Sequence, residues 1–306
     1  MRRTKTQPID RLLYPITCAL LDLLGLFPYR WRQVCAGVFG RLLFTVDRKH
    51  RRIARDNLKR AFDDELSAEQ IDIIARRVFE NLLHVLFEFG WSQSLNDEKI
   101  DAHFTIHGYD DYQAAAAKGK GILLLTAHFG NWELLPILGH MHDVPFRVVY
   151  RPLDTPFLDR IFKESRSRYG GVPIPTHRGA MRQIYKTLRK GYPVAMLMDQ
   201  NVDWYEGVFV DFFNHRACTN TGMAYLALKS GAPVLPLLLI RAGQHFHAVV
   251  GPELETVRTG DLTTDVERNT QLYNQVIEIF VKRFPDQWFW VHQRWKTRPY
   301  CPWPRR

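Results

Sequence analysis

Two titratable side chains follow an apolar segment of the chain. The stretch TAHFGNWELL, Thr126 to Leu135, places His128 at the end of a predicted strand and Glu133 five residues later. Residues five apart on one helix point about 140° away from each other, so the two side chains meet only if His128 lies in the turn before the helix. Gly130 permits such a tight turn. A carboxylate that holds one ring nitrogen of His128 leaves the other free to accept a proton, which is the chemistry of a general base.

The group that such a base would activate is a hydroxyl of the substrate. No serine or cysteine stands in a GxSxG turn, so the sequence offers no protein nucleophile of that type. Backbone N–H groups around Gly130 are expected to stabilise an oxyanion, and Asn131 to cap the helix that follows. The structural alternative is that His128 is a hydrogen-bonded core histidine and Glu133 a surface charge.

Three further predicted strands also end in polar residues. Arg151 follows FRVVY, Asp199 and Gln200 follow YPVAMLM, and Arg241 ends APVLPLLLIR. In open α/β sheets, ligands bind beyond the carboxyl ends of the strands. These side chains and His128 therefore predict a polar cleft along one edge of a sheet.

The elements that would position these residues alternate after about residue 100. Strands are predicted at 103–108, 121–128, 146–151, 172–175, 192–200, 232–241 and 245–252, the last two as a hairpin. Helices are predicted at 109–120, 131–142, 155–170, 178–191, 220–231 and 265–284. Alternation with near-continuous apolar strands predicts an α/β fold, a central mixed, largely parallel sheet flanked by helices. A long helix over 67–91, with Ser67 as N-cap, precedes the sheet.

The positive charge of the chain belongs to its N-terminal part. Residues 1–60 carry fourteen Lys and Arg against four Asp, which accounts for the whole formal charge of +10, whereas residues 61–306 carry 28 charges of each sign. We therefore divide the chain into a basic, apolar helical arm at 1–60 and a catalytic domain at 61–306, of which 61–100 is a helical lead-in.

Four cysteines, at positions 18, 35, 218 and 301, have no metal-ligand spacing and are expected to be reduced thiols.

Two apolar runs interrupt the charge of this arm. They extend from Leu12 to Pro28 and from Val34 to Val46, each with a single charged residue inside it. A spanning helix needs about 20 nearly uncharged residues, so the first run is borderline and the second too short. We expect two helices in the membrane interface or one shallow anchor, beside basic residues that favour an anionic cytoplasmic leaflet. The alternatives are a core-packing helix pair and, because the arm is basic, nucleic-acid binding, against which the long aliphatic runs argue.

The motifs together resemble those of one family. AHFGNWELL resembles the His-x4-Asp/Glu motif of glycerolipid acyltransferases, and its HFGNWE form resembles that of the bacterial late acyltransferases of lipid A assembly, the lauroyl and myristoyl transferases. The stretches VYRPLDTPFLDR, MDQN with GVFVDFF, TGMAYLALKSGAPVLP and WVHQRWKTRP follow in the same order. The resemblance covers nearly the whole chain, although FFNHRACTN departs from the small-residue pattern of the family.

This resemblance implies transfer of an acyl chain from acyl carrier protein to a hydroxyl of a lipid A precursor, an anionic lipid, as a late acylation in lipopolysaccharide biosynthesis. The reaction would take place at the cytoplasmic face of the bacterial inner membrane. It implies His128 as base and Glu133 as its partner, with no metal, no cofactor and no covalent acyl-enzyme. Expected substrate-binding residues are Asn131, Arg151, Arg166, Arg168, Asp199 and Gln200, with Arg166 and Arg168 as alternatives for one contact. No nucleic-acid partner is expected.

Three alternative functions remain at this point. The first keeps the acyl transfer but changes the acceptor to another lysolipid, glycolipid or aminolipid. In a second, water replaces the acceptor and the protein is a membrane-surface lipid hydrolase. In a third, the protein only binds membranes or nucleic acid and its active site has decayed.

Overall fold

A helical layer precedes the sheet in the computed structural model, which describes residues 8–144 and 146–299. Its members are α1 (Pro8–Gly25), α2 (Tyr29–Val46), α3 (Arg48–Phe62), the 3-10 helix η1 (Asp63–Glu65), α4 (Ala68–Ser92) and α5 (Asp97–His103). The predicted N-cap of α4 is confirmed, because Ser67 accepts from the backbone of Gln70 while the Gln70 side chain accepts from the backbone of Ser67. Short α5 was not predicted.

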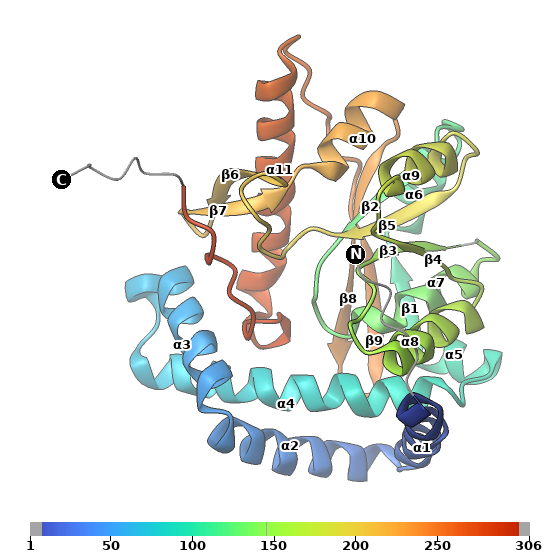
Figure 1. Cartoon of the computed structure of the whole chain (residues 1–306), viewed down its shortest axis with the longest axis vertical. Coiled ribbons are helices and arrows are strands. Elements are labelled where there is room, and N and C mark those ends of the chain that lie inside the picture. Colours follow the sequence, from blue (N-terminus) through green and yellow to red (C-terminus); the bar gives the residue numbers. More distant parts are fainter. Residues whose placement is uncertain (1–7, 145, 300–306) are drawn as a thin grey trace.

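The long helix α4 is the element on which the N-terminal helices pack. Figure 1 shows α4 crossing below the sheet, with α2 lying along it and α1 at one end. Helices α4 and α1 approach closely at Gly90 of α4. A Cβ at this position would lie against the backbone oxygen of Leu21, so the approach requires a residue without a side chain. Among the described helices, none alone has the length and apolar character of a membrane span, whereas α1 and α2 meet both criteria only together and are bent by 117°.

The central sheet has seven strands in the order β1-β9-β8-β2-β5-β3-β4. The strands are β1 (Phe104–His107), β2 (Ile122–Thr126), β3 (Arg147–Tyr150), β4 (Val172–Pro175), β5 (Pro193–Leu197), β8 (Val234–Ala242) and β9 (His245–Val250). Neighbours are parallel except β8 and β9, which form the predicted antiparallel hairpin. The prediction of a mixed, largely parallel sheet is confirmed.

Helices cover both faces of this sheet. They are α6 (Tyr109–Ala116), α7 (Leu135–Met141), α8 (Pro156–Arg168), α9 (Ala180–Leu188), α10 (Gly222–Ser230) and α11 (Leu262–Arg283), with 3-10 helices η2 (Trp132–Leu134) and η3 (Pro285–Gln287). Successive side chains of β2 enter two different clusters, Leu123 and Leu125 one of them and Ile122 and Leu124 the other. Both faces of the strand are buried, which agrees with its continuous apolar run from Ile122 to Leu125.

A separate two-stranded hairpin was missed by the sequence analysis. It consists of β6 (Gly207–Phe212) and β7 (His215–Asn220), which pair antiparallel. Phe213 and Asn214 form its turn with φ values of 51° and 57°. Both residues have the left-handed backbone conformation of the two-residue turns that match the twist of paired strands. The pair lacks the Asn-Gly or Asp-Gly sequence that predicts such turns, so the hairpin was not recognised.

Candidate active site

The pairing of β2 with β5 brings two sequence-distant residues together. Thr126, the last residue of β2, pairs with Leu197, the last residue of β5. His128 and Asp199 each follow two residues later, at the carboxyl edge of the sheet. The ladder extends one step beyond the strands, since Met198 N–H donates to Thr126 O over 3.0 Å. The two side chains therefore leave neighbouring parallel strands at the same level.

Asp199 holds His128 through both its ring and its backbone. The Nδ1 atom of His128 lies 2.9 Å from Asp199 Oδ1, and the backbone N–H of His128 donates to Oδ2 over 2.9 Å. The indole Nε1–H of Trp288 donates to the same Oδ2 over 2.8 Å. An ionised carboxylate at Nδ1 selects the tautomer with its proton on Nδ1, so Nε2 carries the lone pair. This nitrogen faces Gln200, whose Nε2 lies 3.3 Å away.

The carboxyl of Asp199 is ionised although it is completely buried. Burial by itself would raise the pKa of Asp199, but the charge of His128 and the hydrogen bonds from its ring and backbone outweigh burial and lower that pKa well below its usual range. Asp199 is thus a permanent anion behind the imidazole. It was expected to bind substrate, whereas its burial assigns it to orienting His128.

Glu133 does not hold His128 in the structure, contrary to expectation. Its carboxylate accepts from Arg166 twice, from Nε over 2.9 Å and from Nη2 over 2.8 Å. Among the described residues, no hydrogen bond joins Glu133 to His128. The 3-10 helix η2 directs Glu133 toward α8, and the ring of Trp132 lies against that of His128 with centroids 5.0 Å apart. Sequence proximity did not identify the carboxylate that lies at Nδ1 of His128, because it contains no information about the neighbouring strand.

Of the two candidate arginines, the structure brings Arg166 to the site. Its guanidinium lies over the ring of Tyr150, 4.9 Å from the centroid, and is paired with Glu133. The Nη1 atom of Arg166 is buried without a hydrogen-bond partner among the described residues. Arg168 is exposed, because two residues rotate a helix by about 200° and turn it away.

Asn131 supports the loop from inside the protein. It is completely buried, and its Nδ2 donates to Glu88 Oε2 over 3.0 Å and to Val85 O over 3.2 Å, both in α4. It occupies the N-cap position of η2, but its side chain makes no capping hydrogen bond. Asn131 was expected to cap the helix and to contact substrate. In the structure its side chain makes no capping hydrogen bond and is buried against α4.

The turn between His128 and Asn131 is held by the segment after α11. Gly130 has a φ of 58°, and a Cβ there would overlap the backbone oxygen of Leu239. Its N–H donates to Gln287 O over 2.9 Å, and Phe289 N–H donates to His128 O over 3.1 Å. The N–H groups of His128, Phe129 and Gly130 all have intramolecular acceptors, so these three do not form the oxyanion site expected around Gly130.

The remaining predicted edge residues divide into exposed and buried ones. Arg151 follows β3, is exposed and forms no ion pair with another described residue. Arg241 is 9% exposed and pairs with Glu88, so it links β8 to α4 instead of lining a cleft. Trp288, which donates to Asp199, was not singled out by the sequence analysis, although its segment, just before WVHQRWKTRP, adjoins a recognised motif. Within residues 8–144 and 146–299, no group of three or more His, Cys, Asp or Glu could hold a metal ion.

Fold and site together define a class of protein. An α/β sheet that presents a carboxylate-held imidazole, with its second nitrogen beside the Gln200 amide, has the general-base arrangement of group-transfer and hydrolytic enzymes. Residues 4–297 match the family described as bacterial lipid A biosynthesis acyltransferase, and the chain belongs to this family.

Individual relatives are similar over most of their length. A lipid A biosynthesis acyltransferase of Haemophilus influenzae is 26% identical over 91% of this chain and 86% of its own. A lipid A biosynthesis lauroyltransferase of Escherichia coli is 28% identical over 89% of this chain and 87% of its own. A phosphatidylinositol mannoside acyltransferase of Mycolicibacterium smegmatis is 26% identical over 66% of each chain.

Proposed function

We propose that this protein transfers a fatty acyl chain from acyl carrier protein to a hydroxyl of a lipid A precursor, a late secondary acylation in lipopolysaccharide biosynthesis. The observation that carries the proposal is the His128 imidazole, whose Nδ1 is held by the buried anion Asp199 so that Nε2 carries the lone pair, in a chain that belongs to the lipid A acyltransferase family. No serine or cysteine contacts His128 through a hydrogen bond among the described residues, so the nucleophile is the acceptor hydroxyl.

The proposed reaction is a direct transfer between two substrates. His128 Nε2 takes the proton of the acceptor hydroxyl while the hydroxyl oxygen attacks the thioester carbonyl carbon. The tetrahedral intermediate collapses, the C–S bond breaks, and the imidazolium returns the proton to the leaving sulfur. Asp199 stabilises the imidazolium while it exists. Gln200, 3.3 Å from Nε2, is placed to contact the reacting groups.

Two arginines are assigned to the substrates on charge and position. Arg151 is an exposed cation at the end of β3 and is proposed to bind the anionic lipid acceptor. Arg166 has one unpaired buried Nη1 atom beside its ion pair with Glu133. We assign Glu133 the role of holding this arginine in place, so that the guanidinium is oriented before substrate binds.

The apolar face of α1 and α2 is proposed to contact the cytoplasmic leaflet of the bacterial inner membrane. Its exposed members, each at least 39% accessible, are Ile9, Leu12, Ile16, Leu20, Leu23, Leu26, Trp31, Val34, Val38, Phe39, Leu42, Leu43 and Val46. Within each helix most of them are three or four residues apart and so form one stripe, whereas Leu26 lies between the two helices. An exposed apolar surface of this extent favours a lipid or protein contact over an ordinary core-packing pair.

A direct assay tests the proposal. The purified protein is incubated with acyl carrier protein loaded with fatty acid and with a lipid A precursor, and the lipid products are analysed by mass spectrometry. We expect an acylated lipid A precursor, and a loss of about 10²- to 10⁴-fold in rate for His128→Ala with an unchanged melting temperature. Near-wild-type activity of the folded variant contradicts the role of His128.

The same assay separates the alternative functions. Release of free fatty acid without an acylated lipid indicates a hydrolase. Acylation of a mannolipid in preference to the lipid A precursor supports the second candidate, a glycolipid acceptor, which the phosphatidylinositol mannoside acyltransferase relative favours. Absence of any reaction with an intact fold indicates a binding protein.

A further inference from the structure

One segment of the catalytic domain departs from its balanced charge. Residues 165–198 contain seven Lys and Arg and neither Asp nor Glu, although residues 61–306 as a whole carry equal numbers of both signs. Two of the seven cations belong to α8, and the other five lie in or beside α9. These five are Arg178, Arg182, Lys186, Arg189 and Lys190. The sequence therefore concentrates uncompensated positive charge on α9.

The structure leaves these five cations exposed and without acidic partners. None forms an ion pair with another described residue, whereas other surface cations do, such as Lys118 with Glu253 and Lys282 with Glu278. The opposite side of α9 is anchored, because Ile184 and Leu188 are buried in the core. The basic side therefore has a fixed orientation toward solvent.

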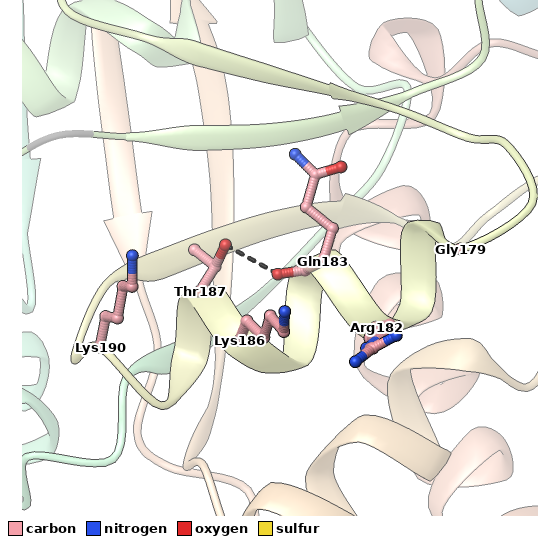
Figure 2. A pocket seen from close by; sticks show the side chains of 6 residues that line it. All are labelled: Gly179, Arg182, Gln183, Lys186, Thr187 and Lys190. Atoms are coloured by element: carbon pink, nitrogen blue, oxygen red, sulfur yellow. Dashed lines mark hydrogen bonds between the residues drawn. The ribbon is translucent and has the colours of Figure 1, made fainter.

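A groove runs along this basic side. Figure 2 shows its lining residues, which are Gly179, Arg182, Gln183, Lys186, Thr187 and Lys190. The groove has a volume of about 450 Å³. From Arg182 to Lys190 the cations extend over about 12 Å of helix axis, which is the length of a short helix laid alongside. No residue of the His128 site lines the groove.

The position of α9 argues against a lipid partner. In Figure 1, α9 and the pair α1–α2 lie far apart along the longest axis of the molecule. If the apolar face of α1 and α2 lies on the membrane, the basic side of α9 faces the aqueous phase, beyond the Debye length of about 8 Å over which lipid charges act. α9 nevertheless packs on β5, the strand that leads to Asp199.

We propose that this basic side of α9 is the docking surface for the acidic carrier protein that presents the acyl thioester. This inference rests on the proposed function. A row of exposed cations attracts an acidic helix by long-range steering, which raises the association rate, and leaves the tethered thioester to reach His128. The surface thus recognises the carrier, while the residues around His128 act on the acyl group.

The test compares two charge-reversal variants that alter net charge equally. Arg182→Glu/Lys186→Glu changes the groove, and Lys99→Glu/Arg268→Glu changes two exposed cations that lack ion pairs elsewhere on the described surface. Each variant is assayed with acyl carrier protein as donor and with a carrier-free acyl pantetheine thioester. We expect the groove variant to raise KM for the carrier-bound donor by about 10-fold or more and to lose its salt dependence, with carrier-free transfer at the wild-type level. The control variant should match wild type with both donors.

Other outcomes overturn the inference. An increase in KM for the lipid acceptor alone would assign the groove to acceptor phosphates, and weaker binding to anionic vesicles would assign it to the membrane. Equal behaviour of both variants would identify an ordinary solvated helix face. Binding of acyl carrier protein, measured by fluorescence anisotropy on wild type and both variants, is independent of catalysis. It therefore tests the docking surface even if no lipid A precursor is acylated.

Discussion

At the scale of single residues, the site depends on one buried anion. Asp199 accepts three hydrogen bonds, two from His128 and one from Trp288. These bonds compensate the loss of solvation that a buried carboxylate otherwise suffers. Because Asp199 stays ionised, it favours the tautomer of His128 with its proton on Nδ1, and in the proposed reaction it stabilises the imidazolium. The neighbouring carboxylate, Glu133, has its charge compensated by Arg166 and makes no hydrogen bond to His128 among the described residues.

Two matched amide substitutions distinguish these carboxylates. Asp199→Asn should lower kcat by about 10²- to 10⁴-fold, because the amide removes the charge at Nδ1 and permits the wrong tautomer. Glu133→Gln should reduce kcat much less and act mainly through Arg166, which raises KM. Steady-state kinetics with one donor and one acceptor measure both constants. A larger fall in kcat for Glu133→Gln than for Asp199→Asn would restore Glu133 as the partner of the base.

At the scale of elements, α4 positions the catalytic loop as well as the N-terminal helices. Its Glu88 forms a bidentate ion pair with Arg241 of β8 and accepts from Asn131 of the loop. Both charges are at least nine-tenths buried. Gln287 of η3 binds the backbone N–H and O of Arg241, so β8, the loop and the C-terminal segment meet at this point.

Breaking this ion pair should destabilise the protein strongly. Glu88→Ala and Arg241→Ala should each lower the free energy of unfolding by about 3–5 kcal/mol, because each leaves an uncompensated buried charge. The double variant should cost less than the sum of the two, since it leaves no isolated charge. Urea denaturation of the four proteins measures the coupling. Additive effects would show that the pair does not act as a unit.

At the scale of the whole molecule, two partly buried histidines connect stability to pH. Burial, which is the largest cause for both, lowers the pKa of His84 and that of His292 to about 4, against 6.5 for an unperturbed histidine. The unfolded chain therefore binds protons that the folded protein excludes between these two values. The stability that this provides is complete above pH 6.5 and is lost progressively as the pH falls toward 4.

The unfolding free energy should therefore decrease between pH 6.5 and 4.5. Each histidine contributes on the order of 1 kcal/mol per pH unit near the middle of this range. His84→Gln/His292→Gln should show a flatter dependence than wild type, measured by urea denaturation at a series of pH values. An unchanged slope in the double variant would mean that other groups dominate acid sensitivity.

The apolar face of α1 and α2 should govern membrane binding. Leu12→Asn/Val38→Asn should weaken binding to anionic vesicles by roughly 10-fold or more, because each residue loses apolar area that the bilayer would bury. Leu262→Asn/Ile279→Asn is the matched control on α11, where both residues are also exposed. Sedimentation with vesicles at low and high salt measures the binding. Equal loss in both variants, or extraction of wild type by salt alone, would contradict an apolar contact.

Local patterns in the sequence determined much of the fold. The continuous apolar run of β2 and the alternation of strands and helices predict a largely parallel sheet with His128 at its carboxyl edge, and Ser67 predicts the start of α4. These features follow from interactions between residues close in the chain, or from burial on both faces. The motifs around His128 also identified the family, later shown by the match over residues 4–297.

The tertiary structure decided which groups act on one another. Asp199 reaches His128 across 71 positions of sequence because β2 and β5 pair in register, and Trp288 joins them from beyond α11. The same long-range packing buries Asn131 against Glu88, in α4. No local propensity specifies such partners. They depend on which strands are neighbours, and that is determined by packing the whole apolar core.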